Sequence, residues 1–338
     1  MKERLGSVLS LVLPCLAPII VLGAFWTGKP WAFSSVIWIY VTALFLDFIA
    51  GEDGSEPAPS PLVLRLITWL WLPLQVMVLF TGLVAVKSSP HWQTLYVVSI
   101  GAGAISGMFG IPVAHELMHR RTLFERVLGE MQMMMFTYTH FCIEHIEGHH
   151  ANVGLWHDPA TARFGETLYQ FLPRTVCIGL VDAWRLEARR LSGAGDRVIG
   201  VHNRMLRYLI TAGALYLVVT MTFGWRGIVF LATQSVVGIL IIESINYVEH
   251  YGLTRLAVEP VTELHSWNSS HRISNWLMFN VPRHSDHHSN ADRPYPLLRH
   301  AGGKQRQLPA GYFAMFVLAL FPPLWRRIMD PLVILEKE

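Results

Sequence analysis

Long runs of apolar residues, separated by short polar segments, dominate the pattern of this chain. An α-helix needs roughly 20 mainly apolar residues, within a range of about 17 to 25, to cross a bilayer. Six runs meet that requirement: Leu5–Trp26, Trp31–Ala50, Leu66–Val86, Trp92–Val113, Tyr208–Gly224 and Ile228–Val248. The first run follows Lys2 and Arg4 but lacks a small-residue cleavage site, so we interpret it as a retained anchor rather than a signal peptide. The pattern predicts an all-α polytopic membrane protein with about six transmembrane helices.

The remaining residues divide into two long polar segments. We expect one domain over residues 1–338, with a transmembrane bundle formed by 5–113 and 208–248 and a helical cap formed by 114–207 and 249–338. Within the cap, residues 312–325 are apolar but too short to span a bilayer and contain a proline pair. They favour an interfacial or re-entrant helix.

Charge places the cap on one side of the membrane. Only 15% of the residues are charged and 52% are apolar, whereas a soluble domain has about 25% charged residues. Residues 114–205 hold ten arginines, and 249–338 hold eight arginines with Lys304 and Lys337. Because basic residues mark cytoplasmic loops, we expect a multi-pass protein of a bacterial-type inner membrane with the cap facing the cytosol. A net charge of +3 gives no indication of nucleic-acid binding.

Histidine is unusually abundant, and its 16 residues fall mostly in clusters. Three motifs, HELMH, EHIEGHH and RHSDHH, and one histidine in NYVEHYGL lie at or just past the predicted inner helix ends. The clustered residues are His115, His119, His145, His149, His150, His250, His284, His287 and His288.

The spacing of these histidines indicates metal binding. Helix positions four apart share a face, so the spacing predicts that His115 stacks with His119 and that His145 stacks with His149. His150 would point about 100° away from His149. Eight or nine imidazoles exceed the three or four ligands of a zinc site, which argues for two metals. Imidazole suits Zn, Cu, Fe and Ni alike, so the residues alone leave the element open.

Carboxylates near the clusters are candidates to orient the imidazole rings. A ligating histidine normally donates its other N–H to a carboxylate or a carbonyl. Glu249 and Asp286 stand inside two of the motifs, and Glu243 precedes Tyr247 and His250 on the same helix face. A carboxylate within a membrane span normally faces a bundle interior or a polar cavity. We therefore select Glu243, Glu249 and Asp286 as candidates that support the site.

These motifs, in this order, resemble those of the membrane-bound alkane monooxygenases, within the membrane fatty-acid desaturase and hydroxylase superfamily. Further similar segments are Asp158-Pro159-Ala160, His265-Ser266-Trp267-Asn268-Ser269 and Leu308-Pro309-Ala310-Gly311-Tyr312, so that the resemblance covers roughly residues 111–331. It implies that the nine clustered histidines bind two iron ions in a non-haem di-iron centre. It also implies hydroxylation of a terminal methyl group with O2, in a membrane-embedded enzyme that takes hydrocarbon from the lipid.

The resemblance implies a rubredoxin and its reductase as electron donors, since this chain has no CxxC pair and no dinucleotide-binding glycine motif. Other functions compete with this one. The same histidine geometry would serve a hydroxylase of aryl methyl groups or terpenes, or a desaturase. A histidine-rich metal transporter is the non-enzymatic alternative, but it would need polar residues along its spans, which are nearly free of them.

Overall fold

The computed structural model describes residues 2–27, 32–53, 61–300 and 305–335. Trp31, Lys304 and Lys337 of the sequence predictions lie outside them. Within the described residues the chain is almost entirely helical, as predicted. The α-helices are α1 (Lys2–Trp26), α2 (Ala32–Ala50), α3 (Pro61–Ser88), α4 (Trp92–Ile105), α5 (Ile111–Met118), α6 (Leu123–Met134), α7 (Phe141–Ile143), α8 (His150–Asn152), α9 (Leu168–Gly193), α10 (Arg204–His250), α11 (Arg272–Leu277), α12 (His284–Ser289), α13 (Tyr312–Ala319) and α14 (Pro322–Leu335).

Short irregular elements complete the fold. Two stretches of π-helix, η1 (Ser106–Gly110) and η2 (Glu144–His149), and two 3₁₀ turns, η3 (Glu263–His265) and η4 (Tyr295–Leu297), adjoin the α-helices. The strands β1 (Trp267–Asn268) and β2 (Arg306–Gln307) form one small parallel pair. The pattern of apolar residues along the chain did not predict these strands.

Among the described residues, three helical stretches are long and apolar enough to cross a membrane: Arg65–Ser88, Trp92–Met118 and Arg204–His250. Shorter apolar stretches cover Leu13–Trp26 and Ser34–Ala50. The predicted fifth and sixth segments both lie in α10, which bends at Gly224, where φ is 68°. Only glycine adopts such a left-handed conformation at little cost. The full set of six spans therefore remains a prediction, although each predicted segment lies on a helix.

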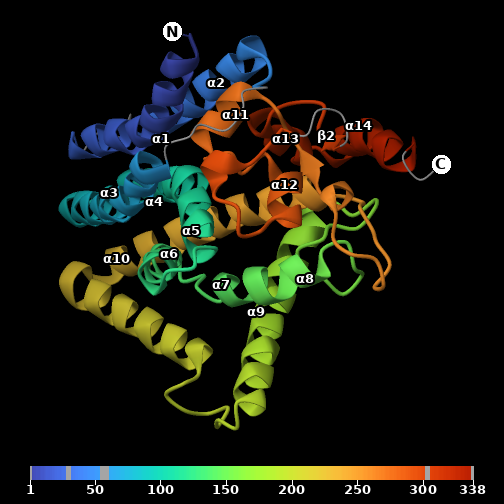
Figure 1. Cartoon of the computed structure of the whole chain (residues 1–338). Helices are drawn as coiled ribbons and strands as arrows, with labels where there is room; N and C mark the ends of the chain where they lie inside the picture. The colour runs from blue at the N-terminus through green and yellow to red at the C-terminus, as the bar shows by residue number, and fades with distance from the viewer. Residues whose placement is uncertain (1, 28–31, 54–60, 301–304, 336–338) are drawn as a thin grey trace.

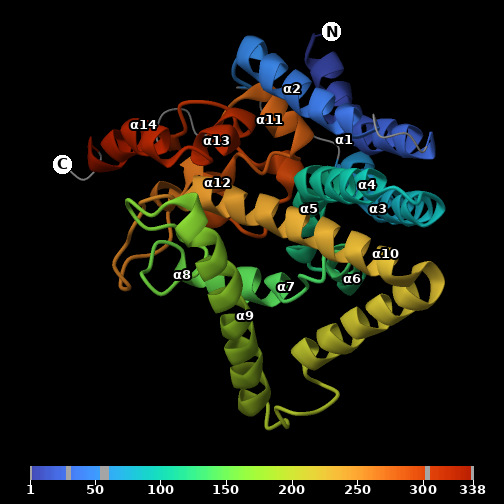
Figure 2. The ribbon, with the colours of Figure 1, turned by 180° about the vertical axis from the view of Figure 1, so that it is seen from behind.

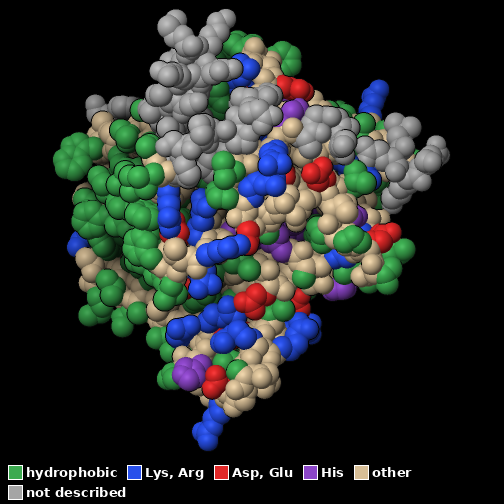
Figure 3. Space-filling view, in the orientation of Figure 1, with side chains coloured by type: hydrophobic (Ala, Val, Ile, Leu, Met, Phe, Trp, Pro, Cys, Tyr) green, Lys and Arg blue, Asp and Glu red, His purple; other side chains and the backbone are tan. Residues whose placement is uncertain are grey.

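Figures 1 and 2 show the arrangement of these helices. The second half of α10 crosses the molecule beside α3 and α4, while α9 and the first half of α10 extend away from the rest. In Figure 3, hydrophobic side chains cover the side where α3, α4 and the bend of α10 lie, and Lys and Arg gather toward the middle and the lower part. This segregation fits a membrane protein with one polar end.

Close packing of α4 against α10 depends on two glycines. A Cβ atom at Gly103 would lie 2.6 Å from the carbonyl oxygen of Gln234, and one at Gly107 would lie 2.9 Å from the Cα of Gly238. Small residues four apart let helix backbones approach each other in this way. The packing brings the end of α5, which carries His115, toward the end of α10, which carries His250.

The C-terminal apolar segment differs from its prediction. Residues 312–325 form parts of two helices, α13 and α14, instead of one. Pro322 and Pro323 stand in the first turn of α14, where a missing N–H costs nothing. The proline pair therefore starts a second helix.

Candidate metal centre

Five histidines form a first group with ligand atoms that all lie within 4.8 Å of one another. These residues come from α5 and its end, from η2 and α8, and from α12: His115, His119, His145, His150 and His287. The Nε2 atoms of His115 and His145 are 2.8 Å apart, and those of His145 and His150 are 3.0 Å apart. The imidazole nitrogens thus converge on one point.

Four further histidines form a second group of the same kind, and all four are buried: His149, His250, His284 and His288. The Nε2 atom of His250 lies 3.1 Å from that of His149 and 3.1 Å from that of His284. His284 and His288, one turn apart on α12, are 3.0 Å apart at the same atoms. The structure therefore brings all nine predicted histidines together, in groups of five and four.

The EHIEGHH motif is divided between the two groups. His145 shares its group with His150, whereas His149 belongs to the other group. The reason is the π-helical turn of η2, in which positions five apart align instead of positions four apart. The His145 and His149 rings do lie close to each other, with centroids 5.3 Å apart, but the two residues belong to different groups, whereas His115 and His119 share one. One short segment thereby serves both groups.

The donor set fits metal ions. Ligands that share one ion at about 2.0–2.1 Å lie on the order of 3 Å apart, which matches the contacts between the Nε2 atoms. Burial, followed by the neighbouring histidines, lowers the pKa of His145, His150 and His287 well below the usual range. These rings are therefore neutral, which is the form that binds a metal. Each neutral imidazole directs a nitrogen lone pair into the group. A metal cation can accept several of these lone pairs at once.

Two contacts orient rings of the second group. Asp158 Oδ2 lies 2.9 Å from His149 Nδ1, and both side chains are fully buried. The Nδ1 atom of His250 lies 3.3 Å from the carbonyl oxygen of His265. Each contact leaves Nε2 free to face the group. The role of Asp158 was missed by reasoning from the sequence, although the residue stood in a segment that resembles the family.

The three carboxylates selected from the sequence have different surroundings. Glu249 Oε2 lies 3.2 Å from His284 Nε2, and the Tyr312 hydroxyl donates to Glu249 Oε1 at 2.9 Å. Glu243 instead accepts hydrogen bonds from Tyr138 in the loop before α7, from Thr175 of α9 and from Asn246 of its own helix.

Asp286 points away from the rings. Its carboxylate accepts hydrogen bonds from the Arg293 side chain and from the backbone N–H of Arg299. Of the three selected carboxylates, Glu249 is therefore the one in contact with a clustered histidine, while Glu243 and Asp286 hold neighbouring segments together.

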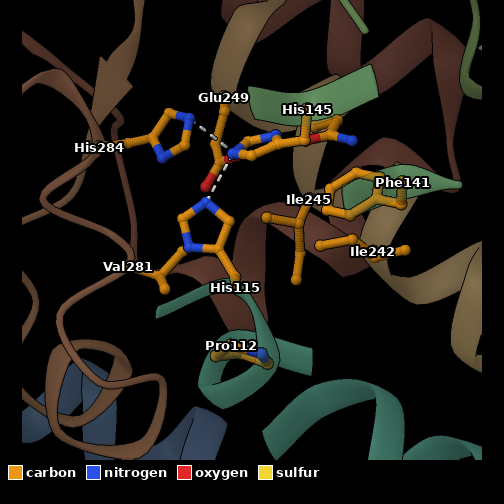
Figure 4. A pocket seen from close by; sticks show the side chains of 10 residues that line it. Pro112, His115, Phe141, His145, Ile242, Ile245, Glu249, Val281 and His284 are labelled. Atoms are coloured by element: carbon orange, nitrogen blue, oxygen red, sulfur yellow. Dashed lines mark hydrogen bonds and ion pairs between the residues drawn. The ribbon is translucent and has the colours of Figure 1, made fainter. Parts of the chain in front are cut away.

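A small cavity of about 10 Å³ lies beside both groups (Figure 4). Histidines of the first group and of the second group reach it, together with Glu249. Its other walls are mostly aliphatic or aromatic: Pro112, Phe141, Ile242, Ile245 and Val281. Figure 4 shows Phe141, Ile242 and Ile245 together on one side of the cavity and His284 on the other. The cavity is therefore a place where an apolar group can approach both sets of nitrogens.

Comparison with known proteins decides the family of the chain. Residues 89–319 match the family model described as fatty acid desaturase. The alkane 1-monooxygenase 1 of Pseudomonas aeruginosa is 38% identical over 90% of this chain and 83% of its own length. This chain belongs to the alkane 1-monooxygenase family. The alkane 1-monooxygenase of Ectopseudomonas oleovorans is 34% identical over 98% of this chain and 86% of its own length.

A relative with another substrate is more distant. The xylene/toluene monooxygenase hydroxylase component XylM of Pseudomonas putida is 29% identical over 85% of this chain and 80% of its own length. Family membership confirms the resemblance seen in the histidine motifs. It also identifies the protein as a monooxygenase-type membrane protein and excludes the alternative of a metal transporter.

Proposed function

We propose that this protein hydroxylates the terminal methyl group of alkanes, giving primary alcohols, at a non-haem di-iron centre in the membrane. The observation that carries the proposal is the cavity with apolar walls beside two convergent histidine groups. The names of the alkane 1-monooxygenase relatives support the choice of substrate. Two electrons and two protons balance the reaction, in which an alkane and O2 yield an alcohol and water.

The proposed metal ligands are the nine histidines, five for one iron and four for the other. When bound, the two ions supply the activation of O2, which the redox-inactive zinc cannot provide. The protein's own task is to fix the rings. Asp158 and the His265 carbonyl perform this task for the second group, as their contacts with His149 and His250 suggest.

The walls of the cavity select the end of the chain. A volume of about 10 Å³ has room for one small group but not for an extended chain. Ile242 and Ile245, one α-helical turn apart on α10, face that space, and Phe141 stacks on the His145 ring at a centroid distance of 4.9 Å. We infer that a methyl group enters this space end-on and displaces water. An apolar substrate needs no polar contact for this step.

Glu249 supplies the one carboxylate in the cavity. The Tyr312 hydroxyl donates a hydrogen bond to Glu249 Oε1, and the other oxygen, Oε2, faces His284. We propose that this hydrogen bond holds Glu249 against the second group, so that a proton on Oε2 can be kept close to the reacting atoms. Glu243 and Asp286 keep supporting roles, as holders of neighbouring helices.

The proposal further places the protein in a bacterial-type inner membrane with about six spans. The bundle of 5–113 and 208–248 would lie in the bilayer, and the cap of 114–207 and 249–338 would face the cytosol. A rubredoxin, reduced by rubredoxin reductase, would bring the electrons to this side. The basic residues of the cap support this orientation.

The central experiment uses membranes that contain the protein, supplied with rubredoxin, its reductase, NADH and O2. Conversion of n-octane to 1-octanol is expected, together with about two irons per chain in the detergent-purified protein. His150→Ala and His284→Ala, one for each group, should abolish the reaction and lower the bound iron. An active variant with full iron content would refute the ligand set, and removable zinc in place of iron would refute the oxygenase.

Aryl methyl hydroxylation is the second candidate, because XylM is among the relatives. The same membranes should be given equal amounts of n-octane and m-xylene. A preference for octane supports the assignment of alkanes as the substrate. Reaction with the aryl methyl group alone would show that aryl methyl groups are the substrate instead.

A further inference from the structure

A wide cleft opens on the side of the protein away from the bend of α10. It has a volume of about 710 Å³ and lies between the loop 154–166 and residues 253–255, with α9 beside it. In Figures 1 and 2 these loops, between α8 and α9 and after α10, project at the end opposite that bend. We propose that this cleft is the docking site of the acidic protein that delivers electrons. The inference rests on the proposed function, since it assigns the surface through which that reaction receives its electrons.

Hydrogen bonds connect the floor of the cleft with the second histidine group. Thr161 lines the cleft, and its hydroxyl donates to Asp158 Oδ2 at 2.5 Å. The same Oδ2 atom lies 2.9 Å from His149 Nδ1, and His149 Nε2 faces His250. Electron tunnelling weakens steeply with distance and follows bonded paths better than gaps. Because all four histidines of the second group are buried, a carrier seated over Thr161 gains a short bonded route to them.

The cleft carries an excess of positive charge. Arg163, Arg174 and Arg255 line it, and Arg326 donates to the carbonyl oxygen of Gly165 at its edge. Three carboxylates oppose these four cations. Glu166 is held by Arg174 through two contacts of 2.7 and 2.8 Å.

The second carboxylate, Glu259, accepts a hydrogen bond from the Leu256 amide at 2.8 Å. The third, Asp330, accepts a hydrogen bond from the Tyr251 hydroxyl, which accepts one from the Gly165 backbone N–H at the edge of the cleft. One positive charge is therefore left in excess around the cleft, and two among the residues that line it, which are three arginines and Glu166. Complementary charge steers partners toward each other and fixes their orientation, so the cleft favours an acidic partner.

Exposed apolar side chains surround the opening of the cleft. Trp156 and Phe164 line the cleft and are 73% and 47% exposed, and Leu256, which follows Arg255, is 65% exposed. The Arg163 guanidinium lies over the Trp156 ring at 3.8 Å from its centroid. Exposed Trp and Arg at the centre of a surface typically contribute most of the binding free energy of an interface. A small electron carrier with an acidic surface and an apolar centre matches this combination better than a membrane surface does.

The test compares binding and electron delivery in charge-reversal and truncation variants of the full-length protein in detergent. Arg163→Glu and Trp156→Ala change the cleft, and neither residue contacts a clustered histidine. Arg121→Glu probes a rival surface, because Arg121 is exposed next to the half-buried His119. Arg189→Glu on exposed α9 is the matched charge-reversal control.

Each cleft variant should raise the Kd for reduced rubredoxin, and its KM, by about tenfold at low ionic strength. The effect of Arg163→Glu should shrink as salt screens the charges. The kcat at saturating rubredoxin should stay unchanged, and Arg121→Glu and Arg189→Glu should bind like the parent protein. An unchanged Kd in both cleft variants overturns the proposal, and so does a loss of binding in Arg121→Glu alone.

A chemical reductant separates this proposal from the proposed function. Dithionite with a small mediator should drive single-turnover hydroxylation of n-octane equally in the parent protein and in both cleft variants. A parent protein that binds rubredoxin but fails with dithionite and O2 refutes the proposed function, not the docking site. Cleft variants that fail with dithionite show damage to the metal centre and overturn the docking interpretation.

Discussion

Asp158 connects a surface loop with the second histidine group. It accepts hydrogen bonds from Thr161 and from the Ala160 backbone N–H, and it lies 2.9 Å from His149 Nδ1. A buried carboxylate in this position fixes the tautomer and the direction of the ring. Asp158 therefore supports the metal centre from a loop that holds none of the nine histidines.

Replacement of this carboxylate gives the first prediction. Asp158→Asn should lower metal affinity or activity by about 10- to 100-fold, because the amide no longer stabilises the His149 tautomer that directs Nε2 to the metal. The measurements are iron per chain after dialysis against a chelator and the rate of octane hydroxylation. Asp292→Asn, at an exposed position paired with Arg121, should retain the parent values. Full iron retention in Asp158→Asn would contradict the role given to this residue.

The sequence predicts the histidines of the site better than it predicts their supports. Nine imidazoles in spaced motifs are visible without a structure, and so is Glu249, which lies inside one of these motifs. Asp158 and the His265 carbonyl are harder to find, because their loops have no periodicity and their contacts with His149 and His250 depend on the tertiary fold. Asp286 shows the opposite error, because proximity in sequence did not bring its carboxylate to a ring.

At the scale of the helices, α4 and α10 are held together by close contact of their backbones. Gly103 meets Gln234 and Val237 of α10, and Gly107 meets Gly238. The spacing of the two glycines permits such a contact, but it does not identify α10 as the partner. The sequence does not predict the π-helical stretches that follow α4 and α7, because one extra residue in a helical turn leaves no clear mark in apolar periodicity.

A second prediction tests the packing of these helices. Gly103→Ala places a Cβ atom 2.6 Å from the Gln234 carbonyl oxygen, so the helices must move apart. The variant should lose about 1–3 kcal/mol of stability, seen as a lower Tm in detergent. Gly213→Ala is the control, because Gly213 lies in α10 with no atom within 4 Å of the added Cβ. It should keep or slightly raise the Tm, since alanine favours helix. Equal Tm values for the two variants would contradict the close approach.

A third prediction concerns the junction of α9 and α10. Burial raises the pKa of the Glu187 carboxyl, but hydrogen bonds from Arg190 and Arg204 outweigh it and bring the pKa to about 2, against 4.5 for the free group. A lowered pKa stabilises the fold above the unfolded value, and this contribution declines as the pH falls from 4.5 toward 2. The Tm in detergent should therefore fall with acidification through this window.

Glu187→Gln should have a lower Tm at pH 7 and a weaker decline on acidification, because no carboxylate is left to protonate. The half-exposed Glu263 supplies the control variant Glu263→Gln, which should follow the pH dependence of the parent protein. A Glu187→Gln variant with the parent's Tm at pH 7 would show that the hydrogen bonds from Arg190 and Arg204 do not stabilise the junction.

The whole molecule joins an apolar part to a polar part that carries the metal centre. Composition and hydropathy predict this division, and the structure confirms the helical fold and candidate membrane helices. The depth of the apolar path to the cavity could not be predicted, because it depends on how side chains of α4, α5 and α10 fill the space between the helices. Phe136, from the turn after α6, also enters this space, because its ring packs directly against Gly238 of α10.

The proposed orientation gives the last prediction. Cysteines introduced at the two ends of the bundle, in a Cys177→Ser background that removes the exposed native thiol, should react on opposite sides of the membrane. Ser192→Cys, at the exposed end of α9, should react with a membrane-impermeant maleimide only in inverted vesicles. His91→Cys, exposed between α3 and α4, should react only in right-side-out vesicles. Labelling of both positions from one side would contradict the single crossing, residues 92–113, that the proposed topology places between them. The reverse pattern would place the metal centre outside the cytosol, where rubredoxin could not reduce it.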